Sequence, residues 1–554
     1  MIDVRSPEEI WKAYDAGRTY KSNIDLYETV EDNERFYIGD QWHGLNAPNI
    51  PKPVLNVLKR TVSMLVAKIC SDDIAANITP FLKDEASEER TKMMSNEVDK
   101  VLELTDIKML GKRALRNAAV DGDGCIYTYW DGDAPTGQDS NGAIRAELID
   151  NINVIFDNPH TTNVDGQRYI IIARRLPVEE VRERAKANGV QNLELIVADT
   201  DTNQYEQGTD NTLVTLLTVL YKQDTVHAVE ATEKCIVRKE WDTELKRYPV
   251  AWLPWERQRN SMHGRAALTD MIPNQIAINK AYAGMLRVIE RYGFPTRVIN
   301  RNFVKDWDGT PGRVIKVEAG QNVDVRTLAA DIEGAQINPS ISTVIGEIIS
   351  YTKDFMGTND ASMGDVRPDN ASAIIALQNA DTIPLELIRQ SYNLFLECVV
   401  RNIVDMMHAN YGVRLVEKTV TDPLTGKPTT IADEFDFEEL NDENLRVSVD
   451  IGAASMWSEI TQIDSLNALF TSGIMDDPRK FRLYIEIVPD KYVPGKAKLL
   501  QWCDEMEAQM NAQMNPHPNE TPTGGELLNP YGDLPMGNIN DAPTIGQEGM
   551  YPNV

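Results

Sequence analysis

The sequence contains no uninterrupted apolar run of the roughly 18 to 20 residues that a membrane-spanning helix needs, although 42% of its 554 residues are hydrophobic. Its first residues, MIDVRSPEEIWKAYDAGR, carry charges where a secretory signal peptide has an apolar segment. We therefore expect a globular, multidomain chain that is made in a cytoplasm and has no membrane partner.

Cysteine is scarce, and no metal-binding pattern is present. The five cysteines are widely spaced, with no CxxC pair: Cys70, Cys125, Cys235, Cys398 and Cys503. An odd number with this spacing favours buried, reduced thiols over a disulfide framework or a zinc site. The DGDG run at Asp121 has the composition of a calcium loop, but it lacks the required glycine placement and the glutamate at the twelfth position. We interpret it as turns and expect neither metal nor cofactor.

Catalytic motifs are missing as well. The nearest approach to a phosphate-binding loop, Gly426-Lys427-Pro428, lacks both the final Ser or Thr and the earlier glycine. No HExxH, GxSxG or GxGxxG occurs, and the six histidines stand singly. No catalytic residue is predicted. A metal-dependent nuclease built on a pair of carboxylates stays open as an alternative, because acidic residues are abundant and nothing in the sequence selects a pair.

Basic residues are too few for a protein that clamps duplex DNA by neutralising its phosphates. The chain has 56 Lys and Arg against 85 Asp and Glu, a net charge of -29. Strong binding to duplex DNA needs clustered Lys and Arg. Such an acidic surface keeps a protein soluble, and it also suits one that must not adhere to a polyanion.

The N-terminal half contains two kinds of sequence pattern. Helical spacing of apolar residues predicts helices over residues 22–38, 53–70 and 84–115. From about residue 125 to 250 the sequence changes to short β-branched and aromatic runs such as CIYTYW, YIIIARR and LVTLLTVLYK. One helix, over residues 178–188, interrupts these runs. The first half therefore predicts an α+β fold.

The next segment consists of two helices that bracket a β-containing excursion. A helix is predicted over residues 273–292, then strand-like PTRVINRNF and GRVIKV around the turn DWDGTPG, and a second helix over residues 338–355. If the two helices pack side by side, the excursion must project from the end that they share.

A loop of small and polar residues, GTNDASMGDVRPDN from Gly357, leads into an apolar-striped helix predicted over residues 371–410. Pro384 lies inside this helix, where it removes one hydrogen bond and predicts a kink. Residues 412–452 return to strands, with TDPLTGKPTT as a hairpin candidate. A helical block over residues 458–514 and a flexible tail rich in proline and glycine over residues 515–554 complete the chain.

The order of these segments resembles the portal proteins of tailed bacteriophages. NERFYIGDQW (residues 33–42), INVIFDNPHTTNVDGQRYIIIARRLPVEEVRER and HGRAALTDMIPNQIAIN, with Gly264, Gln275 and Asn279, are similar to segments of that family. The run Asn370-Ala371-Ser372-Ala373 followed by Gln378 resembles a further family pattern, although Ala373 stands where glycine is common. The resemblance extends over about residues 22–514.

The resemblance implies a multidomain α+β fold with wing, stem, clip and crown regions, assembled as a ring around a central channel. Residues 1–272 would form the wing, 273–293 the first stem helix, 294–334 the clip and 335–357 the second stem helix. Residues 358–372 would form a tunnel loop and 373–457 the long kinked helix with a return to the wing. Residues 458–514 would form the crown helices, and 515–554 the flexible tail.

Three groups of site residues follow from this assignment. The tunnel loop facing DNA comprises Thr358, Asn359, Ser362, Met363, Asp365, Arg367, Asp369 and Asn370. Phosphate contacts in the stem are expected from Lys280, Arg287 and Arg291, and each is equally suited to a salt bridge between subunits. Docking at the clip is expected from Arg301, Lys305, Trp307, Asp308 and Arg313.

The resemblance also implies the partners. They are further copies of the chain in a ring of about twelve, double-stranded DNA in the channel, the large terminase subunit, head-tail adaptor or neck proteins, and the major capsid and scaffolding proteins. The protein would be located in the virion, at one capsid vertex, after assembly in the host cytoplasm. A ring scaffold of non-viral origin is the second alternative, beside the nuclease.

Overall fold

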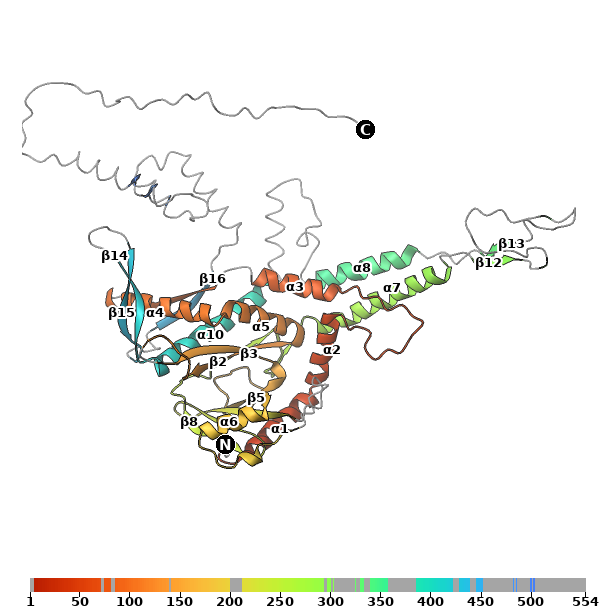
Figure 1. Ribbon diagram of the computed structural model, residues 1–554. Coiled ribbons are helices and arrows are strands. Elements are labelled where there is room, and N and C mark those ends of the chain that lie inside the picture. Colours follow the sequence, from red (N-terminus) through yellow and green to blue (C-terminus); the bar gives the residue numbers. More distant parts are fainter. Residues whose placement is uncertain are drawn as a thin grey trace, which may run out of the picture. The chain divides into compact units, whose positions relative to one another are not determined.

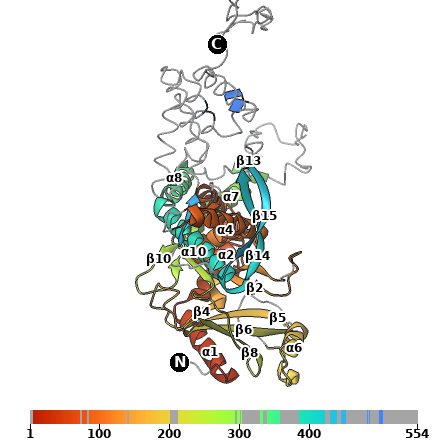
Figure 2. The same ribbon diagram turned by 90° about the vertical axis from the view of Figure 1, so that its left-hand side faces the viewer.

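A computed structural model of the chain is shown in Figures 1 and 2. It describes residues 4–70, 74–80, 85–138, 141–199, 212–292, 296–299, 302, 324, 329–332, 339–356, 385–421, 428–438, 445–451, 482, 485, 499, 500, 502 and 503. The chain divides into two compact units, Met1–Ser458 and Glu459–Val554. Everything below concerns the first unit.

Five helices open the chain: α1 (Pro7–Asn23), α2 (Leu26–Ile38), α3 (Val57–Ile69), α4 (Glu85–Leu104) and α5 (Ile107–Asp121). The sequence prediction of single helices over residues 22–38 and 84–115 was wrong. Each is interrupted by an aspartate in the left-handed region, Asp25 with φ 55° and Asp106 with φ 51°. Aspartate tolerates this conformation better than most residues, so the chain can turn between helices there.

The middle of the first unit contains two antiparallel sheets. The three-stranded sheet has the order β3 (Ala143–Ile149), β2 (Asp123–Asp131), β9 (Val250–Pro254). The five-stranded sheet runs in chain order through β4 (Val154–Phe156), β5 (Tyr169–Pro177), β6 (Leu213–Lys222), β7 (Val226–Ala231) and β8 (Ile236–Asp242). The predicted β-rich texture is confirmed, as is its single helix, α6 (Val178–Ala187).

Helices cover the five-stranded sheet on both faces. Ile10 and Tyr14 of α1 pack on one face, against alternate residues such as Ile171 and Leu217. Val181 of α6 packs on the other face, against residues such as Leu216. Successive side chains of a strand point to opposite faces, so Leu216 belongs to the cluster under α6 and Leu217 to the cluster under α1. Figure 2 shows α1 and α6 beside the sheet.

The three-stranded sheet lies between the five-stranded sheet and a layer of helices that includes α5 and α10 (Glu386–Asn410) (Figure 1). The largest core cluster joins these layers, with Ile126 of β2, Leu115 of α5 and Ile403 of α10 all fully buried. The end of the helix predicted over residues 371–410 is confirmed as α10. Residues 371–384, including the predicted kink at Pro384, lie outside the described residues.

Two strand pairs complete the periphery. β14 (Val413–Thr421) and β15 (Pro428–Asp436) form an antiparallel hairpin, which confirms the prediction from TDPLTGKPTT. β1 (Ile74–Pro80) pairs antiparallel with β16 (Leu445–Ile451), with Ile74 opposite Ile451. The sequence reading did not predict β1, which depends on a partner far along the chain. Shorter elements are η1 (Asn151–Asn153), η2 (Leu193–Leu195), η3 (Thr269–Met271), β10 (Glu256–Arg257) and β11 (Gly264–Arg265).

The two bracketing helices are present and pack against each other. They are α7 (Ile272–Tyr292) and α8 (Pro339–Phe355), drawn side by side in Figure 1. Between them in the chain, β12 (Thr296–Ile299) pairs antiparallel with β13 (Ala329–Ile332). This pairing brings the chain that leaves α7 beside the chain that returns to α8. The names stem and clip remain predictions.

Candidate functional site: the α7–α8 pair and the polar networks at its base

Most of the predicted site residues lie outside the described residues. This applies to the whole tunnel-loop set from Thr358 to Asn370 and to the clip set Arg301, Lys305, Trp307, Asp308 and Arg313. Arg291 lies in α7, but its side chain is not described. Lys280 and Arg287 are exposed on α7. Their spacing of seven residues places them on one face of the helix, two turns apart.

One side of α8 packs inward. Its buried residues are Ile345 and Thr352, and Met356, the first residue after the helix, is also buried. Thr352 Oγ1 accepts a hydrogen bond from Asn274 Nδ2 of α7 at 3.2 Å and donates to the carbonyl of Ile348 at 2.7 Å. Because the contact joins two fixed side chains, it sets the register of α8 against α7.

The other side of α8 exposes large apolar residues. Ile341, Val344, Tyr351 and Phe355 are 36%, 48%, 58% and 74% exposed, and Ile348 between them is partly buried. These five residues, here called the α8 stripe, are spaced three, four, three and four apart. That is the heptad spacing by which one helix packs along another. Isolated exposed apolar residues are ordinary on a protein surface, whereas a contiguous exposed apolar patch is typical of an interaction surface.

A polar network fixes the base of α7 to the N-terminal helices. Gln275 is fully buried; its Nε2 donates to the carbonyl of Leu55 at 2.6 Å and to Asn279 Oδ1 at 3.0 Å, and its Oε1 accepts from the N–H of Val57 at 3.2 Å. Asn279 Nδ2 in turn donates to Gln41 Oε1 at 2.6 Å. The network therefore joins α7 to the loop between α2 and α3.

That loop is itself held by side chains. Trp42 Nε1 donates to the carbonyl of Pro53 at 2.9 Å, and Asn56 Nδ2 donates to the carbonyl of Tyr37 at 2.9 Å. Asn56 Oδ1 also accepts from the N–H of Lys59 at 3.0 Å, which caps α3. For this reason α3 begins at Val57. The sequence prediction, which started this helix at Pro53, was wrong by four residues.

Gln41, Gln275 and Asn279 come from two of the segments on which the resemblance rests. The structure brings them into one network, which sequence order alone does not reveal. Gly264, from the same segment as Gln275, fills another role. A Cβ at this position would lie 2.8 Å from the carbonyl oxygen of Gly122, so the two backbones approach too closely for a side chain.

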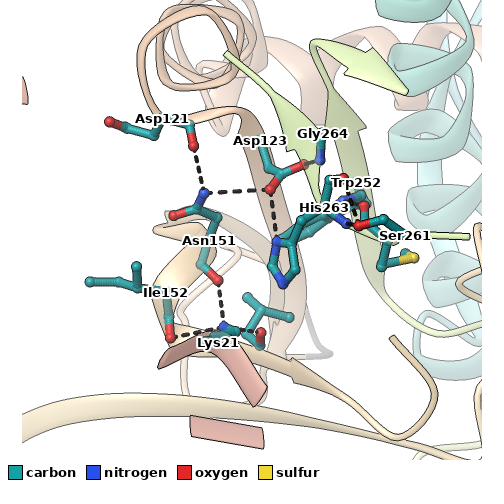
Figure 3. A network of polar contacts seen from close by, with 11 residues as sticks. Lys21, Asp121, Asp123, Asn151, Ile152, Trp252, Ser261, His263 and Gly264 are labelled. Carbon is teal, nitrogen blue, oxygen red and sulfur yellow. Dashed lines mark hydrogen bonds and ion pairs between the residues drawn. The ribbon is translucent and has the colours of Figure 1, made fainter. Parts of the chain in front are cut away.

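A second buried network lies beneath α1, at its contact with the sheets (Figure 3). Lys21 is 2% exposed, and its Nζ donates to the carbonyls of Asn151, Ile152 and Val154 at 2.7, 2.9 and 2.6 Å. Burial lowers the pKa of Lys21 to about 7, while the nearby Asp123 carboxylate opposes this shift. Three acceptors match the three N–H groups of an ammonium ion, so these carbonyls offset part of the cost of burying its charge.

Asp123 connects this network to the segment before α7. Its Oδ1 accepts from the N–H of Gly264 at 2.7 Å, and its Oδ2 lies 2.9 Å from His263 Nδ1. Both side chains of this pair are nearly inaccessible, at 4% for His263 and 0% for Asp123. Asn151 Nδ2 completes the link by donating to Asp123 Oδ2 at 3.4 Å and to the carbonyl of Asp121 at 3.0 Å.

A serine, a histidine and an aspartate so close together call for comparison with a hydrolase triad. In a triad the serine hydroxyl bonds to the imidazole. Here Ser261 Oγ donates to the carbonyl of His263 at 2.9 Å and accepts from its N–H at 3.1 Å. The hydroxyl is engaged by the backbone, so the contacts fasten the loop that carries Met262, whose N–H donates to the carbonyl of Pro159 at 2.8 Å.

Asp121, where α5 meets β2, carries a buried carboxylate that is only partly hydrogen-bonded. Its Oδ1 is buried and has no hydrogen-bond partner among the described residues, and the Arg116 guanidinium lies 3.8 Å from Oδ2. Burial raises the pKa of Asp121 to about 8, although Arg116 opposes the shift; Glu34, Asp150 and Asp123 add to it. Asp121 therefore exchanges its proton near neutral pH.

The described residues offer no group of three or more metal-ligating side chains and no helix that could cross a membrane. Burial also raises the pKa of Cys398 to about 11 and that of Cys125 further, which keeps both as thiols. Sequence reading missed Lys21, Asp123 and His263 as network members. In the sequence these residues stand out only as polar residues among apolar ones, and this pattern does not reveal which groups they bond to.

Together these contacts join an α+β body to the helix pair α7–α8. Residues 12–266 match the model of the phage P22-like portal protein family, which confirms the resemblance over this part of the chain and supports a phage portal protein. The matched range extends from α1 to the end of β11 and stops just before α7. None of the curated proteins matches the chain.

Proposed function

We propose that the chain is the subunit of a phage portal ring, a channel at one capsid vertex through which double-stranded DNA is packaged and later ejected. The observation that carries the proposal is the α8 stripe, read together with the family match. In a closed ring each subunit presents one surface to the next, so an apolar helix face exposed on one subunit is covered by its neighbour. Twelve copies of the 62.2 kDa chain would weigh about 750 kDa.

In this proposal α7 and α8 are the stem helices, and the segment between them is the clip that receives the terminase motor and later the neck adaptor. The body formed by α1–α6 and the two sheets is the wing, residues 358–372 are the tunnel loop and residues 458–514 the crown. The protein is a conduit without catalysis of its own, and it contacts capsid and scaffolding proteins in the virion.

Lys280 and Arg287 are the described candidates for contact with DNA in the stem. Both are exposed, on one face of α7, and seven residues apart. Repeated around a ring, each would form a ring of positive charge at its own height, within a chain whose net charge is -29. Weak, spaced phosphate contacts of this kind guide a moving duplex, and the acidic remainder keeps it from adhering.

Deletion of residues 358–370 tests the channel role directly. The variant is expected to form particles of the same mass as the full chain, because the α8 stripe and the network around Gln275 are untouched. DNA packaging or retention is expected to fail. Normal packaging and retention by this variant would remove the function assigned to the tunnel loop.

A further inference from the structure

A groove of about 760 Å³ opens in the body, between the three-stranded and five-stranded sheets. Its walls come from β2, from β5 to β8 and from α6, and the end of α10 contributes Asn410. This volume lies within the range of sites that bind ligands in proteins. The groove is remote in the chain from the α7–α8 pair, and neither network at the base of α7 contributes to it.

The floor of the groove is a row of polar residues across the five-stranded sheet. In the strand register Thr218 lies opposite Glu230, and Glu230 lies opposite Arg238. The same face is apolar to either side of this row, where Leu216 packs under α6 and Leu220 joins the main core. The polar row therefore interrupts a surface that is otherwise buried and apolar.

Three polar atoms of the groove have no hydrogen-bond partner among the described residues: Glu230 Oε2, Thr218 Oγ1 and Arg174 Nε. Glu230 and Thr218 are only 2% and 3% exposed. The other polar atoms of two of these side chains have partners. Arg184 donates to Glu230 Oε1 at 2.6 Å, and Arg174 Nη2 donates to Glu147 Oε1. A buried polar atom without a partner is costly, so these positions are suited to a ligand that supplies both donors and an acceptor.

The composition of the walls favours a polypeptide as that ligand. Tyr127 and Tyr129 stack at 5.7 Å, with the Arg174 guanidinium over both rings, and Arg238 lies 3.7 Å above the Trp241 ring. Tyrosine, tryptophan and arginine are the residues that dominate binding energy in protein interfaces, where lysine is depleted. The groove lining contains no lysine.

The charge of the lining favours a basic segment. It holds six carboxylates, Asp133, Glu147, Glu180, Glu230, Asp242 and Glu244, against three guanidinium groups, Arg174, Arg184 and Arg238. The difference of three negative charges is uncompensated within the groove. The unpartnered oxygen of Glu230 adds a fixed acceptor at its floor, where a cationic donor is most strongly bound.

We propose that this groove binds an extended, basic segment of a partner protein. A lysine or arginine side chain of the segment donates to Glu230 Oε2, a main-chain carbonyl accepts from Arg174 Nε–H, and Thr218 Oγ1 bonds to the adjacent main chain. The binding site does not depend on the ring or the channel, so an experiment can refute either proposal without affecting the other.

The test uses the full-length chain and two fluorescein-labelled nonapeptides, one with alternating lysine and leucine and one with glutamate in place of lysine. Binding is followed by fluorescence anisotropy. The basic peptide is expected to bind and the acidic one not. Glu230→Gln is expected to weaken binding at least tenfold, whereas Glu179→Gln, at an exposed carboxylate of α6, is expected to change it less than twofold.

Thr218→Val separates binding from folding. In the free protein it removes a hydroxyl that has no partner, so the unfolding temperature is expected to stay the same or rise, while peptide affinity falls at least threefold. The proposal is overturned if the basic peptide does not bind. Equal binding by wild type, Glu230→Gln and Thr218→Val also overturns it, because the attraction then comes from the net charge of the whole chain.

Discussion

The body and the α7–α8 pair differ in how far their apolar residues are buried. In the body, Tyr14 of α1 is 3% exposed and Leu217 of β6 is fully buried, and even the charged Lys21 has its bonds inside the protein. On α8, Phe355 is 74% and Tyr351 58% exposed. The body buries its apolar residues within the chain, whereas α8 leaves a continuous apolar stripe exposed, which in the proposed ring a neighbouring subunit would cover.

The two regions should therefore differ in what stabilises them. Substitutions in the body change the free energy of unfolding of the single chain. Substitutions on the α8 stripe are expected to change assembly, because in the proposed ring these residues become buried only when a neighbour covers them. Substitutions in the two regions test this contrast.

The pair Tyr351→Glu and Phe355→Glu is expected to abolish assembly. Two charges on the α8 stripe would have to be buried at each contact between neighbours, which costs several kcal/mol per contact. Mass photometry is expected to show particles near the 62.2 kDa of one chain in place of about 750 kDa. The urea unfolding of the body should be unchanged. Ser342→Glu, at an exposed position outside the stripe, is the control and should still assemble.

Lys21→Met is expected to lower the free energy of unfolding by about 3 kcal/mol, because three buried carbonyls lose their donor. The pH dependence has a definite sign. The pKa of Lys21 is about 7 in the folded chain and 10.5 in the unfolded chain, so between these values the unfolded chain holds the extra proton. The free energy of unfolding of the wild type therefore rises with pH between about 7 and 10.5. Urea unfolding should show that the difference between the wild type and Lys21→Met increases over this range.

Gln275→Ala is expected to cost about 2 kcal/mol, since the carbonyl of Leu55 and the side chain of Asn279 lose their partner in a buried site. The effect sharpens the comparison because the network joins the body to α7. Urea unfolding measures the loss, and Asn274→Ala, which removes one contact to Thr352, should cost less. An equal cost for both variants would show that the network does not anchor α7.

Asp121→Asn is expected to have the smallest effect at pH 5, and its stability relative to the wild type is expected to increase as the pH rises to 9. The pKa of Asp121 is raised from 3.8 to about 8 in the folded chain. The folded chain thus holds a proton that the unfolded chain has lost, and wild-type stability falls as the pH rises from about 4 to 8. Thermal unfolding across this range measures the difference, with the exposed Asp133→Asn as control. A constant difference at all pH values would contradict the assignment.

Local patterns in the sequence were sufficient for much of the fold. The β-branched runs of β5 and β6, the helical spacing in α7 and the turn residues between β14 and β15 all predict structure from neighbouring residues. The breaks at Asp25 and Asp106 could not be predicted, because an aspartate within a helical pattern is also compatible with a continuous helix. The pairing of β1 with β16 depends on a segment distant in the chain, which periodicity does not reveal.

The candidate site divides in the same way. Gln275 and Asn279 could be singled out from their segment, yet their bonds to Leu55 and Gln41 depend on how α7 meets the loop before α3. Lys21 looked like an ordinary surface lysine in a charged stretch, and only the three carbonyls around η1 give it a structural role. The residues of the tunnel loop and the clip stay predictions.

Imaging of the purified full-length chain, together with its mass, tests the central claim most directly. We expect a ring with a central hole and a mass of about 750 kDa, in which α7 and α8 of neighbouring subunits lie in contact along the α8 stripe. A chain that stays at 62.2 kDa under all conditions, with the stripe exposed to solvent, would contradict it.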